Sequence, residues 1–247
     1  MCMITGNATI SHTCIFAREA GAERQYLAYA MKMKTAVDVA MVLPLPIARN
    51  AGENALTFID LSGYPLLFND LFNAMGFMGF GAAPTPRGGA SKDLVVHEVG
   101  SFEASFVPTI ADFARLDERF RLPAGTWDKL PAYRDFGFAV FKFKAGEQKI
   151  HPMALSFPRA DTSTLFFPTV HFHDGEVHEQ ADFDHQLYAQ TGERHMLAAE
   201  KWTESSSLAE RKMDIKRAGG IIAGDQHIHY RQLKGKLPNQ DTLLKFG

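Results

Sequence analysis

The feature that most constrains the fold is a succession of strand-like runs near the start of the chain. Residues 10–18 form one such run, residues 19–23 read as a turn, and residues 24–34 alternate between apolar and polar side chains. The next run, residues 36–43, is mostly apolar, which is typical of a strand buried on both faces. It stops at Pro44-Leu45-Pro46, where the prolines cannot donate hydrogen bonds to a sheet. These runs predict a three-stranded antiparallel meander.

The rest of the chain keeps this strand-rich character. Helical spacing of apolar residues predicts helices over 66–75 and 109–120. We expect an α+β fold that is strand-dominated, with mostly antiparallel sheets and a few packed helices, in one domain over residues 1–247. A Gly- and Pro-rich loop at 76–90 is where two lobes of that domain would separate. Further strands are predicted at 94–99, 102–107, 136–144, 149–157 and 165–173.

Composition excludes several classes of protein. The net charge is −2 and no basic stripe is present, so nucleic acid is not an expected partner. No apolar run approaches the roughly 20 residues that a membrane-spanning helix needs. The amino terminus lacks the basic start and long apolar stretch of a secretory signal, and the two cysteines, Cys2 and Cys14, fit a reducing compartment. We therefore expect a soluble, cytoplasmic protein.

A histidine-rich segment, His171 to Glu179, carries the clearest chemical signal. Asp174-Gly175 lies between two short alternating runs, and this dipeptide favours a two-residue hairpin turn. Residues paired across such a hairpin share a face, so the polar side chains would gather on one side. The expected cross-strand pairs are His173 with Glu176, Phe172 with Val177, and His171 with His178.

Imidazoles beside a carboxylate are a natural ligand set for a divalent transition metal such as zinc, iron or manganese. Glu176 would serve as a fourth ligand or as the general base of a metal-dependent hydrolase. His227 and His229 would face one side of a late strand and complete the site. An alternative stays open, because a solvated hairpin face with several histidines needs no metal. The predicted ligands are His171, His173, His178 and His185.

The chain also resembles a known protein family in the order of four short motifs. Val39 to Pro46 ends a strand in Leu-Pro-Leu-Pro, Glu98 to Ser105 joins two strands at a glycine, Arg121 to Gly125 follows a helix, and Ser163 to Pro168 ends in Phe-Phe-Pro. This layout resembles the uncharacterised bacterial family known as domain of unknown function 2330, over about residues 8–170. The resemblance implies a fold grouping and no activity. Members of that family usually carry a signal peptide, which this chain lacks.

Two further hypotheses compete with the metal site. Removal of Met1 would expose Cys2 as an amino-terminal nucleophile that supplies thiol and amine together, as in some amidohydrolases. A buried, unreactive Cys2 is the alternative. In the other hypothesis the protein is a non-enzymatic structural or ligand-binding module, with a small molecule or a protein as partner. Its contact surface would be the loop at 76–90, where Phe77 and Phe80 lie among glycines.

Overall fold

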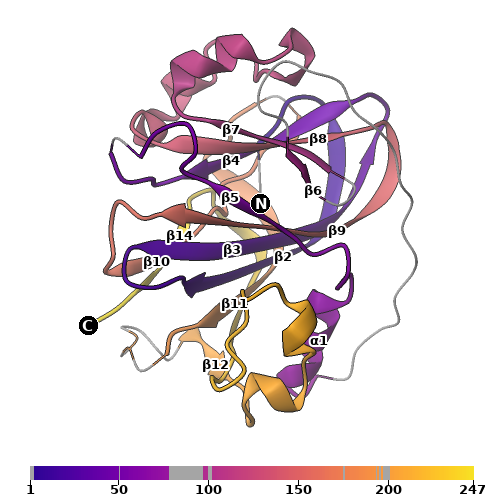
Figure 1. Ribbon diagram of the computed structural model, residues 1–247. Helices are drawn as coiled ribbons and strands as arrows, with labels where there is room; N and C mark the ends of the chain where they lie inside the picture. Colours follow the sequence, from indigo (N-terminus) through magenta and orange to yellow (C-terminus); the bar gives the residue numbers. More distant parts are fainter. Residues whose placement is uncertain are drawn as a thin grey trace.

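The computed structural model (Figure 1) describes residues 3–49, 51–77, 97–99, 102–174, 176–192, 194, 196 and 201–247. The predicted α+β class is confirmed, because strands dominate and nearly all neighbouring strands are antiparallel. The predictions for residues 1, 2, 78–96, 175 and 197–200 lie outside the described residues. They include Cys2 and most of the loop at 76–90.

The larger sheet has seven strands in the order β12-β13-β11-β2-β3-β9-β5. Neighbouring strands are antiparallel except β11 and β2, which run parallel. The bounds are β2 Ala8–Glu19, β3 Arg24–Thr35, β5 Thr57–Asp60, β9 Gly146–Pro158, β11 Gln180–Gln190, β12 Thr203–Glu204 and β13 His229–Pro238.

A five-stranded antiparallel sheet in the order β1-β4-β8-β7-β6 packs against the first, and β10 and β14 form a short pair. All seven residues of β4 are buried, as expected for an apolar strand that is covered on both faces. The bounds are β1 Met3–Ile4, β4 Val39–Leu45, β6 His97–Val99, β7 Phe102–Val107, β8 Gly137–Phe143, β10 Thr164–Phe167 and β14 Thr242–Lys245.

Three apolar clusters show that the molecule is layered. The largest cluster draws residues from both sheets, including Leu27, Met41 and Leu187, so it lies between them. A second cluster joins the outer face of the seven-stranded sheet to the helix α1 (Leu67–Ala74) and to the segment 209–228. A third joins the outer face of the five-stranded sheet to residues 110–133. In Figure 1 these two coverings lie at opposite ends of the molecule, with the sheets between them.

Short 3₁₀ helices make up most of the remaining helical structure. The predicted helix at 109–120 is two 3₁₀ turns, because Leu116 is extended and separates them. Of the four apolar residues whose spacing predicted this helix, Phe113, Leu116 and Phe120 are buried, and Ile110 is only partly buried. The 3₁₀ bounds are η1 Ile110–Arg115, η2 Glu118–Phe120, η3 Trp127–Lys129, η4 Pro131–Tyr133, η6 Ala209–Arg211 and η7 Ile215–Arg217.

The predicted three-stranded meander is wrong in its third strand. Strands β2 and β3 pair as expected, but β4 leaves them and pairs with β8 and β1 in the other sheet. Residues 36–38 form the connection between the sheets. The apolar character of β4 therefore predicted its burial correctly, but it did not predict which strands lie beside it.

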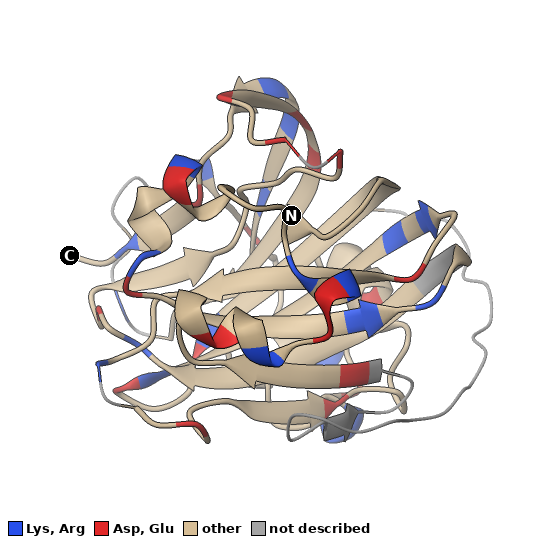
Figure 2. Ribbon diagram, turned by 90° about the horizontal axis from the view of Figure 1, so that it is seen from above, with Lys and Arg blue, Asp and Glu red and all other residues tan. Residues whose placement is uncertain are grey.

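In the parts of the chain that are drawn, charged residues of one sign do not gather into a large surface patch. Figure 2 shows acidic and basic residues interspersed over loops and strand ends. Within the described ranges, every helix is too short or too polar to cross a lipid bilayer.

Candidate functional site

The histidine-rich segment does not form the predicted hairpin. Strand β10 ends at Phe167, immediately before Pro168, whose backbone has no N–H to donate. The backbone groups that follow bind elsewhere: the His171 N–H donates to Asn239 Oδ1 (2.8 Å), and the His173 carbonyl accepts from the Ala8 N–H (3.0 Å). Within the described parts of the segment, only residue 172 makes a strand-type bridge, and its partner is Met3 rather than Val177. The hairpin register is therefore wrong.

Three of the four predicted ligands nevertheless come together. The His171 ring lies between two other imidazoles, 5.3 Å from that of His185 and 6.1 Å from that of His173, centroid to centroid. The three rings are nearly parallel, with interplanar angles of 21° and 8°. Phe183 packs edge-on against His171 at 4.7 Å. The fourth residue, His178, lies on the surface with its Nε2 2.7 Å from Asp174 Oδ2.

The two inner imidazoles are buried deeply enough to be uncharged. His185 shares a face of β11 with Phe183 and Leu187 and therefore points into the core between the sheets. It is fully buried, and neither ring nitrogen has a hydrogen-bond partner. His171 is 4% exposed, and its Nδ1 also has no partner. Burial lowers the pKa of His171 to about 3 and lowers the pKa of His185 further.

The remaining predicted site residues do not join this cluster. Glu176 is exposed, and its N–H donates to Asp174 Oδ1. His227 contacts the Ser205 carbonyl through Nδ1 (2.8 Å), while His229 lies 3.4 Å from the Thr191 hydroxyl. Across the described residues no set of three or more His, Cys, Asp or Glu side chains is arranged to hold a metal ion. Metal binding stays a prediction, and so does a role for Cys2.

A row of aromatic rings supports the start of the Gly- and Pro-rich loop. Phe77 packs against Phe72 at 5.0 Å and against Tyr230 at 5.2 Å. Tyr230 in turn packs against Tyr188 at 5.3 Å, on the neighbouring strand β11. Phe77 keeps 36% of its surface exposed. The loop predicted as a partner-binding surface therefore starts from an aromatic residue that is fixed to the large sheet and still accessible.

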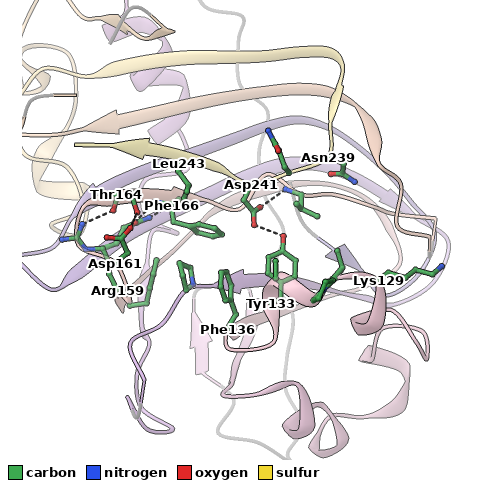
Figure 3. Close-up of a pocket in the computed structure, with 18 residues that line it drawn as sticks. Lys129, Tyr133, Phe136, Arg159, Asp161, Thr164, Phe166, Asn239, Asp241 and Leu243 are labelled. Atoms are coloured by element: carbon green, nitrogen blue, oxygen red, sulfur yellow. Dashed lines mark hydrogen bonds between the residues drawn. The ribbon is translucent and has the colours of Figure 1, made fainter. Parts of the chain in front are cut away.

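A cavity of about 490 Å³ forms a second candidate site (Figure 3). Tyr133, Phe136 and Phe166 lie in a row along it, with ring centroids 5.2 and 5.9 Å apart. Leu243, 47% exposed, lies on its edge. A mostly apolar cavity of this size with a few polar groups is typical of small-molecule sites. The other lining residues are Gln25, Pro46, Lys129, Leu130, Pro131, Ala132, Phe157, Arg159, Asp161, Thr164, Val170, Asn239, Gln240 and Asp241.

The main polar interaction in the cavity is a hydrogen bond between residues that are far apart in the sequence. The Tyr133 hydroxyl donates to Asp241 Oδ2 (2.7 Å), and the Val170 N–H donates to Asp241 Oδ1 (2.9 Å). Tyr133 and Asp241 are 108 positions apart, so no local pattern could have revealed the pair. Neither residue belongs to a motif described in the sequence, so this site was not predicted.

Comparison with known proteins shows a fold and no family. No family model matches the chain, and no curated protein matches it. The crystal structure of baculovirus P35 matches at a TM-score of 0.53 with 11% sequence identity, covering 99% of both chains. The crystal structure of the caspase-8/P35 complex matches at a TM-score of 0.47 and 10% identity, covering 96% of both chains. At these identities the likeness establishes the fold alone, and the resemblance to domain of unknown function 2330 stays a prediction.

Proposed function

We propose that this chain is a non-enzymatic protein-binding module, and that its partner is a protease of the caspase type. The observation that carries the proposal is the match to P35 over 99% of both chains. P35 has been solved in complex with caspase-8. Because one fold can host unrelated functions, the proposal of a caspase partner is an analogy of fold, and at 11% identity the partner of this chain is left to experiment.

The proposed contact surface is Phe77 together with the loop residues that follow it. Phe77 is held by Phe72 and Tyr230 and remains 36% exposed. A partly exposed aromatic side chain loses little conformational entropy on binding when its neighbours already hold it. Aromatic residues are also enriched at the centres of protein interfaces. These properties support a binding surface at this end of α1.

The state of the predicted catalytic groups favours binding over catalysis. His171 and His185 are buried under other side chains, where a substrate cannot reach either nitrogen of His185 or the Nδ1 of His171. Glu176, the predicted general base, is exposed, and its carboxylate makes no hydrogen bond or ion pair with either ring. A general base has to lie within hydrogen-bond reach of the proton that it removes, in a site that a substrate can enter. The proposed module therefore uses its surface rather than an internal active centre.

The proposal is tested by mixing the purified full-length chain with purified caspase-8 and measuring complex formation by size-exclusion chromatography. A caspase peptide-substrate assay on the same mixture reports whether the caspase active site is occupied. We expect the wild-type chain to co-elute with caspase-8. The double variant Phe77→Ser and Phe80→Ser should lose at least tenfold in affinity, because it removes both aromatic residues of the loop.

The matched control is Val37→Ser, in the turn between β3 and β4. Val37 is 58% exposed, so this change also removes an exposed apolar side chain but at another place. The control should bind like the wild type. A wild-type chain that does not bind caspase-8 would contradict a caspase as partner. Equal binding by the double variant would contradict the loop as the contact surface.

A further inference from the structure

Two charged groups that line the cavity of Figure 3 are compensated by other groups of the protein. Arg159 is 5% exposed, and its Nη2 lies 2.9 Å from Glu19 Oε1. Asp161 accepts hydrogen bonds from the N–H and the hydroxyl of Ser163 and from the hydroxyl of Thr164. Hydrogen bonds from Ser163 and the charge of Arg159 hold the pKa of Asp161 below its usual value. Both charges are therefore balanced before any ligand binds.

The Asp241 carboxyl group is compensated as well. Its oxygens accept from the Tyr133 hydroxyl and the Val170 N–H. Burial raises the pKa of Asp241, while the hydrogen bonds from Val170 and Tyr133, the positive amino terminus and the Thr169 backbone oppose the rise. The other charged lining residue, Lys129, is exposed, and in Figure 3 its side chain points away from the aromatic row. Among the described residues that line the cavity, none therefore holds an uncompensated charge inside it.

The side-chain amides in the wall are occupied in the same way. The Gln25 Nε2 donates to the Phe166 carbonyl (2.7 Å), and its Oε1 accepts from the Phe166 N–H (3.0 Å). Asn239 directs its amide at the backbone of His171 and His178. These polar atoms join segments of the protein to each other. What the wall offers to a ligand is therefore mainly the surface of rings and aliphatic side chains.

This apolar surface comes from two parts of the chain (Figure 3). Phe166 and Leu243 are directly paired across β10 and β14, so their side chains share a face of this pair. Tyr133 and Phe136 come from the 3₁₀ turn η4 and the residues that follow it. Leu243 is 47% exposed at the edge of the cavity. A ligand in the cavity would remove part of this exposed leucine from water, which favours binding.

We propose that the cavity binds an uncharged aromatic molecule, which packs against the rings of Tyr133, Phe136 and Phe166 and is covered at the edge by Leu243. An aromatic ligand gains edge-to-face or offset contacts with such rings in addition to its burial. The volume of about 490 Å³ is within the range of small-molecule sites. An ion of the same shape would lose its hydration without gaining an unpaired partner. This inference is independent of the proposed protein partner, because it uses neither Phe77 nor the loop that follows it.

The test uses three probes that share a naphthalene body: 2-naphthalenemethanol, 2-naphthylmethylamine and 2-naphthoate. Each is titrated into the full-length chain at pH 7.5, by calorimetry or by ligand-observed NMR. We expect one molecule of the alcohol to bind per chain, about tenfold more tightly than the ammonium or the carboxylate probe, because only the ions give up the hydration of a charge. Binding of either ion as tight as that of the alcohol would overturn the proposal. Uptake of several alcohol molecules without saturation, or no binding of the alcohol, would also overturn it.

A pair of leucine variants tests the position of the ligand. Leu243→Ser removes the apolar edge of the cavity and should weaken binding of the alcohol about fivefold to tenfold. Leu66→Ser is the matched control, since Leu66 is 39% exposed at the start of α1 and should bind the alcohol like the wild type. Equal affinity of the two variants would contradict the assignment.

A direct measurement keeps the proposal testable if Leu243→Ser does not fold. In the wild-type chain, intermolecular nuclear Overhauser effects should connect the naphthalene protons of the alcohol to the methyl groups of Val170 and Leu243, which both line the cavity. Such effects only to methyl groups outside the cavity would overturn the proposal.

Discussion

The imidazole rings of His171 and His185 lie 5.3 Å apart and within 21° of parallel, and both are buried without partners for at least one ring nitrogen. Such groups stay neutral because a charged imidazole would lose its hydration, and the Asp184 carboxylate, 4.0 Å from the His185 Nδ1, is too far away to form a hydrogen bond. The two residues therefore make the stability of the folded protein sensitive to acid.

Acid should destabilise the protein through these two residues. The folded pKa of each lies below the value of about 6.5 that an unfolded histidine has, so the unfolded chain binds more protons below that pH. Stability is then fully present above about pH 6.5 and is lost as the pH falls. The loss is about 1.4 kcal/mol per pH unit for each histidine. Denaturant unfolding at pH 7, 6 and 5 measures it.

The variant His185→Leu isolates the contribution of one ring. It should lower the dependence of the unfolding free energy on pH by about 1.4 kcal/mol per pH unit, because it removes one titrating group. The surface variant His178→Gln is the matched control, since the side chain of His178 is 46% exposed and should change the dependence less. An unchanged slope in His185→Leu would show that its imidazole is already charged in the folded protein.

Metal content gives a separate test of the histidine cluster. Among the described residues, no three His, Cys, Asp or Glu side chains, those of His171, His173 and His185 included, are arranged to hold one metal ion. We expect elemental analysis of the purified chain to find well under one equivalent of zinc, iron or manganese. The double variant His171→Ala and His173→Ala should have the same content. One equivalent in the wild type, lost in the double variant, would support the metal hypothesis instead.

The paired strands β2 and β3 show what local pattern can predict. Residues 24–34 alternate and follow a short polar turn, and adjacent strands joined by a short turn usually pair. The burial of β4 could also be predicted, because an apolar run has to be covered on both faces. The sheet that β4 joins depends on β8, about a hundred residues later, and no local feature specifies that pairing.

The hairpin prediction for the histidine-rich segment was wrong for a related reason. Asp174-Gly175 is a strong hairpin signal only when the flanking residues are free to pair with each other. Here the Asn239 side chain binds the segment through three hydrogen bonds: its Oδ1 accepts from the His171 N–H, and its Nδ2 donates to the carbonyls of His171 and His178. One side chain from a distant part of the sequence thus replaces the hydrogen bonds that a local hairpin would make. The predicted clustering of imidazoles holds for His171, His173 and His185 but not for His178, and the hairpin geometry that led to it was wrong.

The pair Arg159 and Glu19 yields a stability prediction. The Arg159 side chain is 2% exposed, whereas Arg194, which contacts the same Glu19 oxygen at 2.8 Å, is 37% exposed. Glu19→Gln should cost about 3 kcal/mol of unfolding free energy, because it leaves a buried guanidinium without its counter-charge. Arg194→Met should cost about 1 kcal/mol or less, since exposed ion pairs contribute little. Chemical denaturation of both variants at pH 7 compares them, and equal losses would contradict the distinction.

A last prediction concerns the close packing around Gly137 in β8. A Cβ atom at this position would lie 2.7 Å from the Ile47 Cδ1 and from the Phe106 Cε2, whereas one at Gly63 would meet nothing within 4 Å. Gly137→Ala should therefore lower the free energy of unfolding by about 1–3 kcal/mol, because rings and methyl groups in a packed interior have little room to move. Gly63→Ala should change it by less than about 0.5 kcal/mol. Thermal or denaturant unfolding of the two alanine variants compares the same chemical change in two surroundings. A Gly137→Ala protein as stable as Gly63→Ala would mean that Phe106 turns aside without cost.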